Sequence, residues 1–439
     1  MITSTAPTVG REVKTASQWR LPIIILVALA LRLAVGPFDS IEGLLDPANL
    51  YRWSYGNVAR ALVAGRGFGS ALHSNQLSAM MPPVYSVIVA IMFKLFGVFT
   101  HGAIFAVHAF DSVLSSLAVI PIFLMTRRSF GERVAWWAAW AWACSPYGIY
   151  FSAAMAWSTH LLLFCLCWLL YLAQDLERSP QLALWAGFGL LAGFAGLTEP
   201  SILVVVAFLL ALAAWRLARA GKKWLFPGGV ALLVLAATIS PWMIRNAVVF
   251  HRFIPMRDSM GLELWMGNNG YDVRFTSEHL NPLNDMKELA DYDRMGETAY
   301  MDHKAQQATT YIHAHPGWYV RMCVRRAVYL WTGYWSFDPE YLKLEPMDPF
   351  NVPFQSAFTL LGLIGLCLAW RRAPWEAVRF AGVMFLFPII YYLSHPQPYH
   401  MRTLDPLVTI LGCLAVVSWL QRKRAAMRAE PGIPVETTQ

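Results

Sequence analysis

Residues 200–217 read PSILVVVAFLLALAAWRL, and this stretch decides the fold class. Its one charged side chain is Arg216, close to the end of the run. A helix needs about 20 mainly apolar residues to cross the hydrocarbon core of a bilayer. The segment is therefore predicted to be a transmembrane helix.

Further apolar runs of similar length extend this prediction to the whole chain. Of the 439 residues, 57% are hydrophobic and only 14% are charged, whereas about a quarter of the residues are charged in a typical soluble domain. We therefore predict an all-α integral membrane protein with about ten crossings. The predicted crossings are 21–36, 103–126, 133–150, 155–173, 182–198, 200–217, 225–244, 354–370, 377–394 and 403–420.

Basic residues predict the orientation, because cytoplasmic loops are enriched in Lys and Arg. The basic loops include Arg127 and Arg128, Lys222 and Lys223, and Arg371 and Arg372. All of them lie on one side only if residues 84–98 do not cross. That segment is short and contains Lys94, so it is predicted to be a re-entrant or interfacial helix. Both termini are then cytoplasmic.

The predicted topology divides the chain into six regions. Residues 246–352 form a polar outer insertion that holds 14 of the 27 acidic residues and 10 of the 35 basic ones. The net charge of +8 therefore resides mainly in short loops, which indicates topology and not nucleic-acid binding. The regions are 1–36 (arm and first crossing), 37–83 (first outer loop), 84–245 (membrane bundle), 246–352 (outer insertion), 353–421 (last crossings) and 422–439 (cytoplasmic tail).

Two helices are predicted within the outer insertion. The first covers 285–314, beginning at Asp285 and ending before Pro316. The second covers about 317–334, where arginines alternate with Trp and Tyr as in an interfacial helix.

No metal or cofactor is expected. The six cysteines include no CxxC pair. His313 and His315 are two residues apart, which places them on different faces of a helix. No P-loop or dinucleotide fingerprint is present.

The first outer loop carries the candidate catalytic residues. Asp39, Glu42 and Asp46 directly follow the first predicted crossing. A carboxylate at the headgroup level can act as general base toward an acceptor hydroxyl. These three acids are therefore candidate catalytic residues.

Short motifs spread over most of the chain resemble the GT-C superfamily of membrane glycosyltransferases. The likeness is greatest to bacterial members of glycosyltransferase family 39, which include protein O-mannosyltransferases and the lipid A aminoarabinose transferase. The motifs are Tyr51, Ala59, Gly65-Arg66-Gly67-Phe68, Pro82-Pro83-Val84-Tyr85, Phe96-Gly97, Thr198-Glu199-Pro200, Ser240-Pro241-Trp242-Met243-Ile244-Arg245-Asn246, Gly267-Asn268-Asn269 and Arg402-Thr403-Leu404-Asp405-Pro406.

This resemblance implies a GT-C-type bundle and a specific reaction. A sugar would be transferred with inversion from a polyprenyl-phosphate donor to the hydroxyl of a lipid, glycan or protein, on the outer side of the bacterial cytoplasmic membrane. The family's catalytic acid precedes a Tyr, which favours Asp46 before Tyr51, although Asp39 and Glu42 form a rival pair. Some relatives place a phosphate-binding Lys where this chain has Met81.

Arginines are therefore the expected contacts of the lipid phosphate, because the guanidinium fork matches phosphate geometry. Arg66, Arg245 and Arg402 stand at outer positions of the predicted topology. Glu199, at the outer end of a crossing, is a further substrate-binding candidate, since acids in apolar stretches are costly and are often functional. Tyr51 and the turn residues Asn268 and Asn269 complete the expected binding set.

Two functions of other classes stay open at this point. A transporter or lipid flippase would show repeats and broken helices at the membrane midplane, and the sequence has no obvious repeat. A noncatalytic membrane subunit would bind a partner through residues 246–352.

Overall fold

The computed structural model describes residues 9–36, 38–46, 52–72, 76–270, 280–336, 339–344 and 347–429. Within these ranges the chain is helical, and its one β-type pairing is an isolated bridge between Gly69 and Leu77. The helices are α1 (Val9–Val35), α2 (Phe38–Leu45), α3 (Ser54–Val63), α4 (Pro83–Phe96), α5 (His101–Leu117), α6 (Val119–Phe130), α7 (Glu132–Ala143), α8 (Pro146–Ala154), α9 (Thr159–Leu176), α10 (Leu182–Gly196), α11 (Ile202–Arg219), α12 (Leu225–Phe250), α13 (Met260–Gly267), α14 (Met286–Met295), α15 (Glu297–Ala314), α16 (Pro316–Thr332), α17 (Pro339–Leu344), α18 (Asp348–Arg372), α19 (Pro374–Leu386), α20 (Ile389–Leu393), α21 (Pro398–Arg402) and α22 (Asp405–Ala429).

The expectation of an all-α membrane protein is confirmed. In the described part of the chain, six helical segments are long and apolar enough to cross a bilayer, and α4 and α10 are shorter apolar helices. The number of ten crossings stays a prediction. The six segments are His101–Phe130, Thr159–Leu176, Ile202–Arg219, Leu225–Phe250, Asp348–Arg372 and Pro374–Leu393.

The predicted crossing 133–150 is not one continuous helix. It is divided into α7 and α8 because Pro146 begins a new helix, with the Ser145 hydroxyl accepting a hydrogen bond from the Gly148 amide. Arg32 of α1 donates to the carbonyl oxygens of Trp142 and Ala143, at 3.2 and 3.0 Å, where α7 ends. The buried guanidinium thus binds carbonyls at the end of α7, and the Trp142 carbonyl also accepts a hydrogen bond from the Ser145 amide at 3.2 Å.

Glycines allow the long helices to approach closely. A Cβ atom on Gly189 of α10 would lie 2.3 Å from the carbonyl oxygen of Ala231 in α12. A Cβ atom on Gly365 of α18 would lie 1.9 Å from the Leu411 carbonyl oxygen in α22. Small residues at such positions are typical of helix contacts inside membranes.

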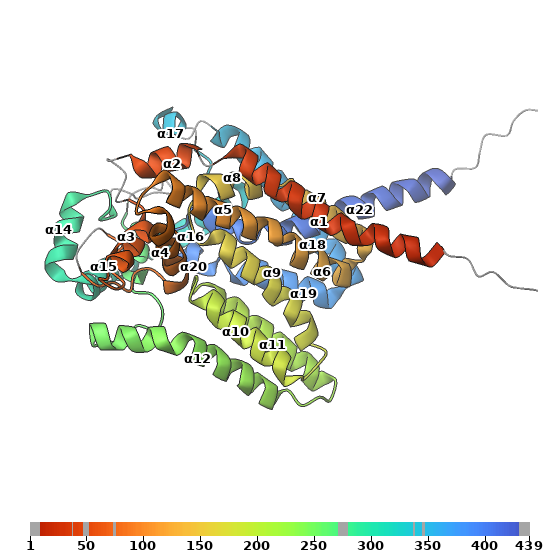
Figure 1. The fold of residues 1–439 in the computed structure, drawn as a ribbon, viewed down its shortest axis with the longest axis horizontal. Helices are drawn as coiled ribbons and strands as arrows, with labels where there is room; N and C mark the ends of the chain where they lie inside the picture. Colours follow the sequence, from red (N-terminus) through yellow and green to blue (C-terminus); the bar gives the residue numbers. More distant parts are fainter. Residues whose placement is uncertain are drawn as a thin grey trace, which may run out of the picture.

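The bundle has two ends (Figure 1). At one end lie α2, α3, α14 and α15, and at the other lie the start of α1 and the end of α22. Arg128 and Asp175, both from loops predicted to be cytoplasmic, form an ion pair at 2.9 Å, and Glu177 from the same region pairs with Arg379 of α19 at 2.6 Å. We call the end with α2, α3, α14 and α15 the cap end.

Helix α4 lies with both of its ends toward the cap end. Its first turn is held there, because the Val84 amide donates to the carbonyl of Leu197, which follows α10. Near its last turn, the Phe93 ring contacts Trp53, and the Trp53 indole donates to Ala156 in the loop between α8 and α9. The segment therefore passes along one end of the bundle.

The prediction of one helix over 285–314 is wrong. Asp285 does begin α14, and its carboxylate accepts hydrogen bonds from the amides of Lys287 and Glu288. Gly296, however, has a positive φ of 81° and separates α14 from α15. Glycine adopts this left-handed conformation without the steric cost that a Cβ atom brings, so the chain turns at this position.

Candidate active site

Two adjoining cavities open at the cap end, with volumes of about 500 and 270 Å³. The residues that line them are far apart in the sequence. They come from the α10–α11 junction, the segment leading into α13, and the α20–α21 region. The residues that line both cavities are Glu199, Arg257, Glu263, His395 and His400.

Arg257 is the central cation of this shared wall. Its Nε donates to the Met80 carbonyl oxygen at 2.8 Å, just before α4. Its Nη2 donates to Glu263 Oε1 at 3.1 Å, and its Nη1 lies 3.6 Å from Glu199 Oε1. One side chain therefore joins α13, the α10–α11 junction and the segment before α4.

The two glutamates have opposite pKa shifts. Burial raises the pKa of Glu199, with Arg257 opposing this and Glu263 adding to it. Burial also acts to raise the pKa of Glu263, but a hydrogen bond from His395 and the charge of Arg257 outweigh it and lower this pKa to about 2. Paired carboxyl groups with separated pKa values are typical of acid–base sites.

An aromatic wall stands beside these carboxylates. The Trp157 ring lies 5.3 Å from Tyr399, and Tyr399 lies 4.6 Å from the His400 ring. His400 stacks on Tyr391 at 3.9 Å between ring centroids. Burial lowers the pKa of His400 to about 3, so this imidazole is neutral near pH 7. The wall offers flat apolar faces next to polar groups.

The larger cavity also has an apolar flank. Val204 of α11, Leu386 and Phe387 at the end of α19, and Ile389 and Ile390 of α20 line it. These residues belong to segments that are long and apolar enough to cross a membrane. The cavity thus connects an apolar surface among membrane helices with a charged region at the cap end.

Comparisons with known proteins agree with this architecture. Residues 80–244 match the family model for dolichyl-phosphate-mannose-protein mannosyltransferase. An oligosaccharyltransferase of Archaeoglobus fulgidus, in its apo form, aligns over 93% of this chain and 51% of its own, with 14% identity and a TM-score of 0.53. A search of curated proteins found no match.

The chain has the GT-C fold. The resemblance to the GT-C superfamily drawn from the sequence motifs is therefore confirmed. AglB in complex with an inhibitory peptide and a dolichol-phosphate aligns with 15% identity and a TM-score of 0.50, over 94% of this chain and 51% of that one. ArnT from Cupriavidus metallidurans, bound to undecaprenyl phosphate, aligns with 14% identity and a TM-score of 0.43, over 94% and 80%. This GT-C chain spans about half the length of the archaeal chains it matches.

Among the residues predicted from the sequence, Glu199 lies in the shared wall of the two cavities. Glu42 is exposed on α2, and Asp46 is exposed directly after that helix, with its amide donating to the Glu42 carbonyl. Asp39 is part of α2, but its side chain lies outside the described residues, as does Tyr51 altogether.

Arg245 holds the first outer loop against α12. It donates to the carbonyl oxygens of Ser78 and Phe68, at 2.8 and 3.2 Å, and its guanidinium lies 5.0 Å from the ring of Trp242. Arg66, on the same loop, is exposed, and its amide donates to the Ala61 carbonyl. Neither arginine is among the residues that line the two cavities.

Asn268, Asn269 and Arg402 also make contacts within the fold. Asn268 is fully buried and donates to the Leu393 carbonyl, which joins α13 to α20. Asn269 donates to the Trp265 carbonyl of its own helix. Arg402 lies over the Tyr147 ring at 3.9 Å and forms an ion pair with Asp405 at 3.3 Å. These three residues position helices around the cavities without lining them.

Sequence reasoning missed several residues of the site. Arg257 lies between α12 and α13 and Glu263 lies in α13, whereas His395 lies between α20 and α21 and His400 lies in α21. Arg52 lines the smaller cavity and immediately follows the expected Tyr51. A search for polar residues just beyond predicted crossings would have found His395, which immediately follows 377–394, but not Arg257 or Glu263.

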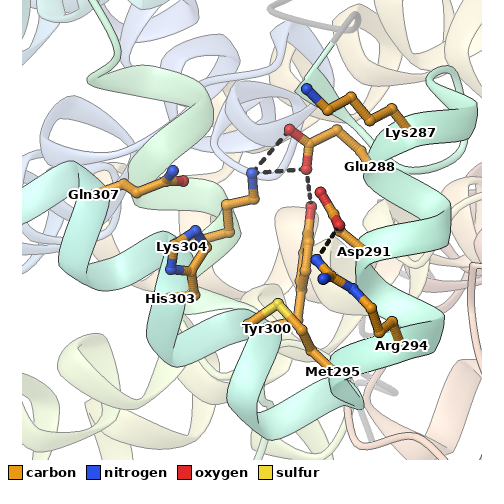
Figure 2. A pocket seen from close by; sticks show the side chains of 9 residues that line it. All are labelled: Lys287, Glu288, Asp291, Arg294, Met295, Tyr300, His303, Lys304 and Gln307. Carbon is orange, nitrogen blue, oxygen red and sulfur yellow. Dashed lines mark hydrogen bonds and ion pairs between the residues drawn. The ribbon is translucent and has the colours of Figure 1, made fainter.

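A separate polar pocket of about 510 Å³ lies between α14 and α15 (Figure 2). Its charges are largely paired within the fold. Lys304 Nζ lies 2.6 Å from Glu288 Oε2, which also accepts a hydrogen bond from the Tyr300 hydroxyl, and Arg294 pairs with Asp291. The contacts of Glu288 with Lys304 and Tyr300 join the two helices, whereas the Arg294–Asp291 pair lies within α14.

Proposed function

We propose that this chain is a membrane glycosyltransferase that transfers a sugar from a polyprenyl-phosphate carrier to the hydroxyl group of a lipid, glycan or protein. The observation that carries the proposal is the amphipathic cavity. Its apolar flank suits a polyprenyl chain, and its charged wall at Arg257 suits a phosphate-linked sugar.

The comparisons support the same substrate class. The matching family model describes mannosyltransferases that use dolichyl phosphate mannose. One structure with the same fold contains a dolichol-phosphate and a peptide. A lipid-linked donor and a hydroxyl-bearing acceptor are therefore the expected partners of this chain.

The proposed chemistry needs one base. A carboxylate removes the proton of the acceptor hydroxyl, and the oxygen attacks the anomeric carbon in line. The bond to the phosphate oxygen breaks, and the configuration at the anomeric carbon inverts. The lipid phosphate leaves as a stable anion, so cations such as Arg52 and Arg257 at the cavity suffice to stabilise it.

The base is proposed to come from one of two groups of acids. The first outer loop provides Asp39, Glu42 and Asp46, and the cavity wall provides Glu199 and Glu263. The basic loops are predicted to lie on the side of the membrane opposite to the cavities. This distribution supports cavities that face outward from the bacterial cytoplasmic membrane, with both termini in the cytoplasm.

Deletion of the gene tests this function directly. Mass spectrometry of lipid extracts and of cell-envelope glycans should show accumulation of one polyprenyl-phosphate sugar and loss of one sugar from an acceptor. Expression of the wild-type chain should reverse both changes. Unchanged lipid-linked sugars and glycans in the deletion strain would refute the proposal.

A further inference from the structure

The two cavities contain few groups that can accept a proton from a hydroxyl near neutral pH. Among the described residues that line them, the carboxylates are Glu199 and Glu263. The two exposed acids of the first outer segment, Glu42 and Asp46, do not line either cavity. A base must reach the proton that it abstracts, by direct contact or through one water.

Glu263 is engaged at both of its oxygens. Oε1 accepts a hydrogen bond from Arg257 at 3.1 Å, and Oε2 lies 3.4 Å from His395 Nδ1. A carboxylate held by two such partners is stabilised in its charged form, and it is a weak proton acceptor for that reason. Glu263 therefore suits a role in holding Arg257 and His395.

Glu199 is held less tightly by charged partners, although its carboxylate also accepts a hydrogen bond from the Ser201 backbone. Arg257 lies 3.6 Å from its Oε1, which is an ion-pair distance and longer than a hydrogen bond. The side chain is 12% exposed, and it faces both cavities from the junction between α10 and α11. It thus stands where the apolar flank and the aromatic wall meet.

We infer that Glu199 is the general base that deprotonates the acceptor hydroxyl. This inference rests on the proposed function. The proton moves from the hydroxyl oxygen to a Glu199 carboxylate oxygen while that hydroxyl oxygen forms a bond to the anomeric carbon. The electron pair of the broken bond stays on the lipid phosphate. Glu199 then returns its proton to water through the open cavity.

The charges around Glu199 fit this role. Burial opposes the ionised form and raises the pKa of Glu199, and Glu263 adds to this shift, whereas Arg257 and the Ser201 backbone hydrogen bond favour the ionised form. Tyr55 of α3, Tyr391 of α20 and Tyr399 of α21 also face it. Burial raises the pKa of the Tyr55 and Tyr399 phenols, so both are neutral near pH 7. A carboxylate with a raised pKa is a stronger base than an ordinary one.

The test uses full-length wild type, Glu199→Gln, Glu199→Asp and Asp302→Asn in membranes. The probe is a lipid extract of the deletion strain, in which unused donor accumulates, and the acceptor is the envelope fraction of the same strain. Release of polyprenyl phosphate is measured by mass spectrometry. A dilution series of the extract separates kcat from the relative KM. Asp302 is the control, because this acid is exposed and pairs only at the surface with Arg252.

The expected result is a loss of about 10²–10⁴-fold in kcat for Glu199→Gln with a nearly unchanged donor KM. Glu199→Asp should keep an intermediate rate, and Asp302→Asn should stay within about twofold of wild type. The wild-type rate should fall as the pH is lowered through the pKa of Glu199, and this limb should be absent from the residual rate of Glu199→Gln.

Three results would overturn the inference. One is a Glu199→Gln variant that retains at least half of the wild-type kcat. Another is a loss confined to the donor KM, which would make Glu199 a positioning residue for Arg257. The third is an unchanged acidic limb in the Gln variant. Wild-type membranes that release no polyprenyl phosphate would instead refute the proposed function itself.

Discussion

Single polar residues link the first outer loop to the outer insertion. The carboxylate of Glu297, which is 3% exposed on α15, accepts hydrogen bonds from the Ser78 hydroxyl at 2.5 Å and the Ala79 amide at 2.6 Å. It also accepts one from the Tyr292 hydroxyl at 2.8 Å. The segment that ends at Met80, whose carbonyl binds Arg257, is therefore positioned by a residue more than 200 positions away in the sequence.

This contact makes the stability of the protein depend on pH. Burial raises the pKa of Glu297 to about 7, against the opposing effect of its three hydrogen bonds. The folded chain therefore retains a proton that the unfolded chain loses, and Glu297 contributes less stability as the pH rises from about 4.5 to 7. Glu297→Gln cannot ionise, so its thermal midpoint should fall less than that of wild type between pH 5 and pH 7.5.

Thermal unfolding in detergent at several pH values measures this difference. Asp302→Asn removes an exposed acid from the same helix and should follow the wild-type curve. Parallel curves for wild type and Glu297→Gln would contradict the assignment of the pH dependence to Glu297.

The sequence identified some residues of the site and missed others for a physical reason. Glu199 could be found because an acid beside an apolar run is unusual in any context. Arg257 could not be found in this way, because its role depends on contacts that the local sequence does not show. Met80 and Glu199 are far from it in the chain, and Glu263 lies on the following helix, α13. Arg245 was expected to bind the lipid phosphate. In the structure, its guanidinium instead donates hydrogen bonds to the backbone carbonyls of Ser78 and Phe68.

At the scale of helices, the close contact of α13 with α15 positions Glu263. A Cβ atom on Gly261 would lie 1.9 Å from the Met301 carbonyl oxygen, which belongs to the backbone of α15. Gly261→Ala should therefore displace α13, lower the thermal stability by about 1–3 kcal/mol, and reduce sugar transfer. The reduction follows because α13 carries Glu263 beside Arg257.

Gly317→Ala is the matched control for this change. Gly317 lies in the first turn of α16, also in the outer insertion, and a Cβ atom there would meet no atom within 4 Å. This variant should be as stable as wild type or slightly more stable, since Ala favours a helix. Equal thermal midpoints for the two alanine variants would show that the α13–α15 contact is not restrictive.

Helix positions were predicted well where the signal is local. Apolar runs such as 200–217 and 225–244 correspond to α11 and α12, because the bilayer requires length and hydrophobicity within one segment. Breaks were predicted less well. The turn at Gly296 and the interruption at Pro146 depend on one residue each, and hydropathy averaged over a window does not resolve them.

At the scale of the whole molecule, the position of the cavities depends on the orientation of the bundle. The cavities and the exposed Asp302 belong to the cap end. The exposed Lys222 lies in the basic loop between α11 and α12, which is predicted to be cytoplasmic. If the cap end faces outward, Asp302→Cys should react with a membrane-impermeant thiol reagent in cells whose outer membrane alone is permeabilised. Lys222→Cys should react only after the inner membrane is opened.

Each variant is compared with the parent chain, because Cys144 and Cys367 are exposed and give a background signal. The lipid-linked donor must present its sugar on the side to which the cap end is exposed, so the orientation decides whether the proposed reaction occurs outside the cytoplasm. Labelling of Lys222→Cys and protection of Asp302→Cys in cells with an intact inner membrane would place the cap end in the cytoplasm. The cavity would then have to draw its sugar donor from the cytoplasmic leaflet, and the outward transfer proposed for this chain would be excluded.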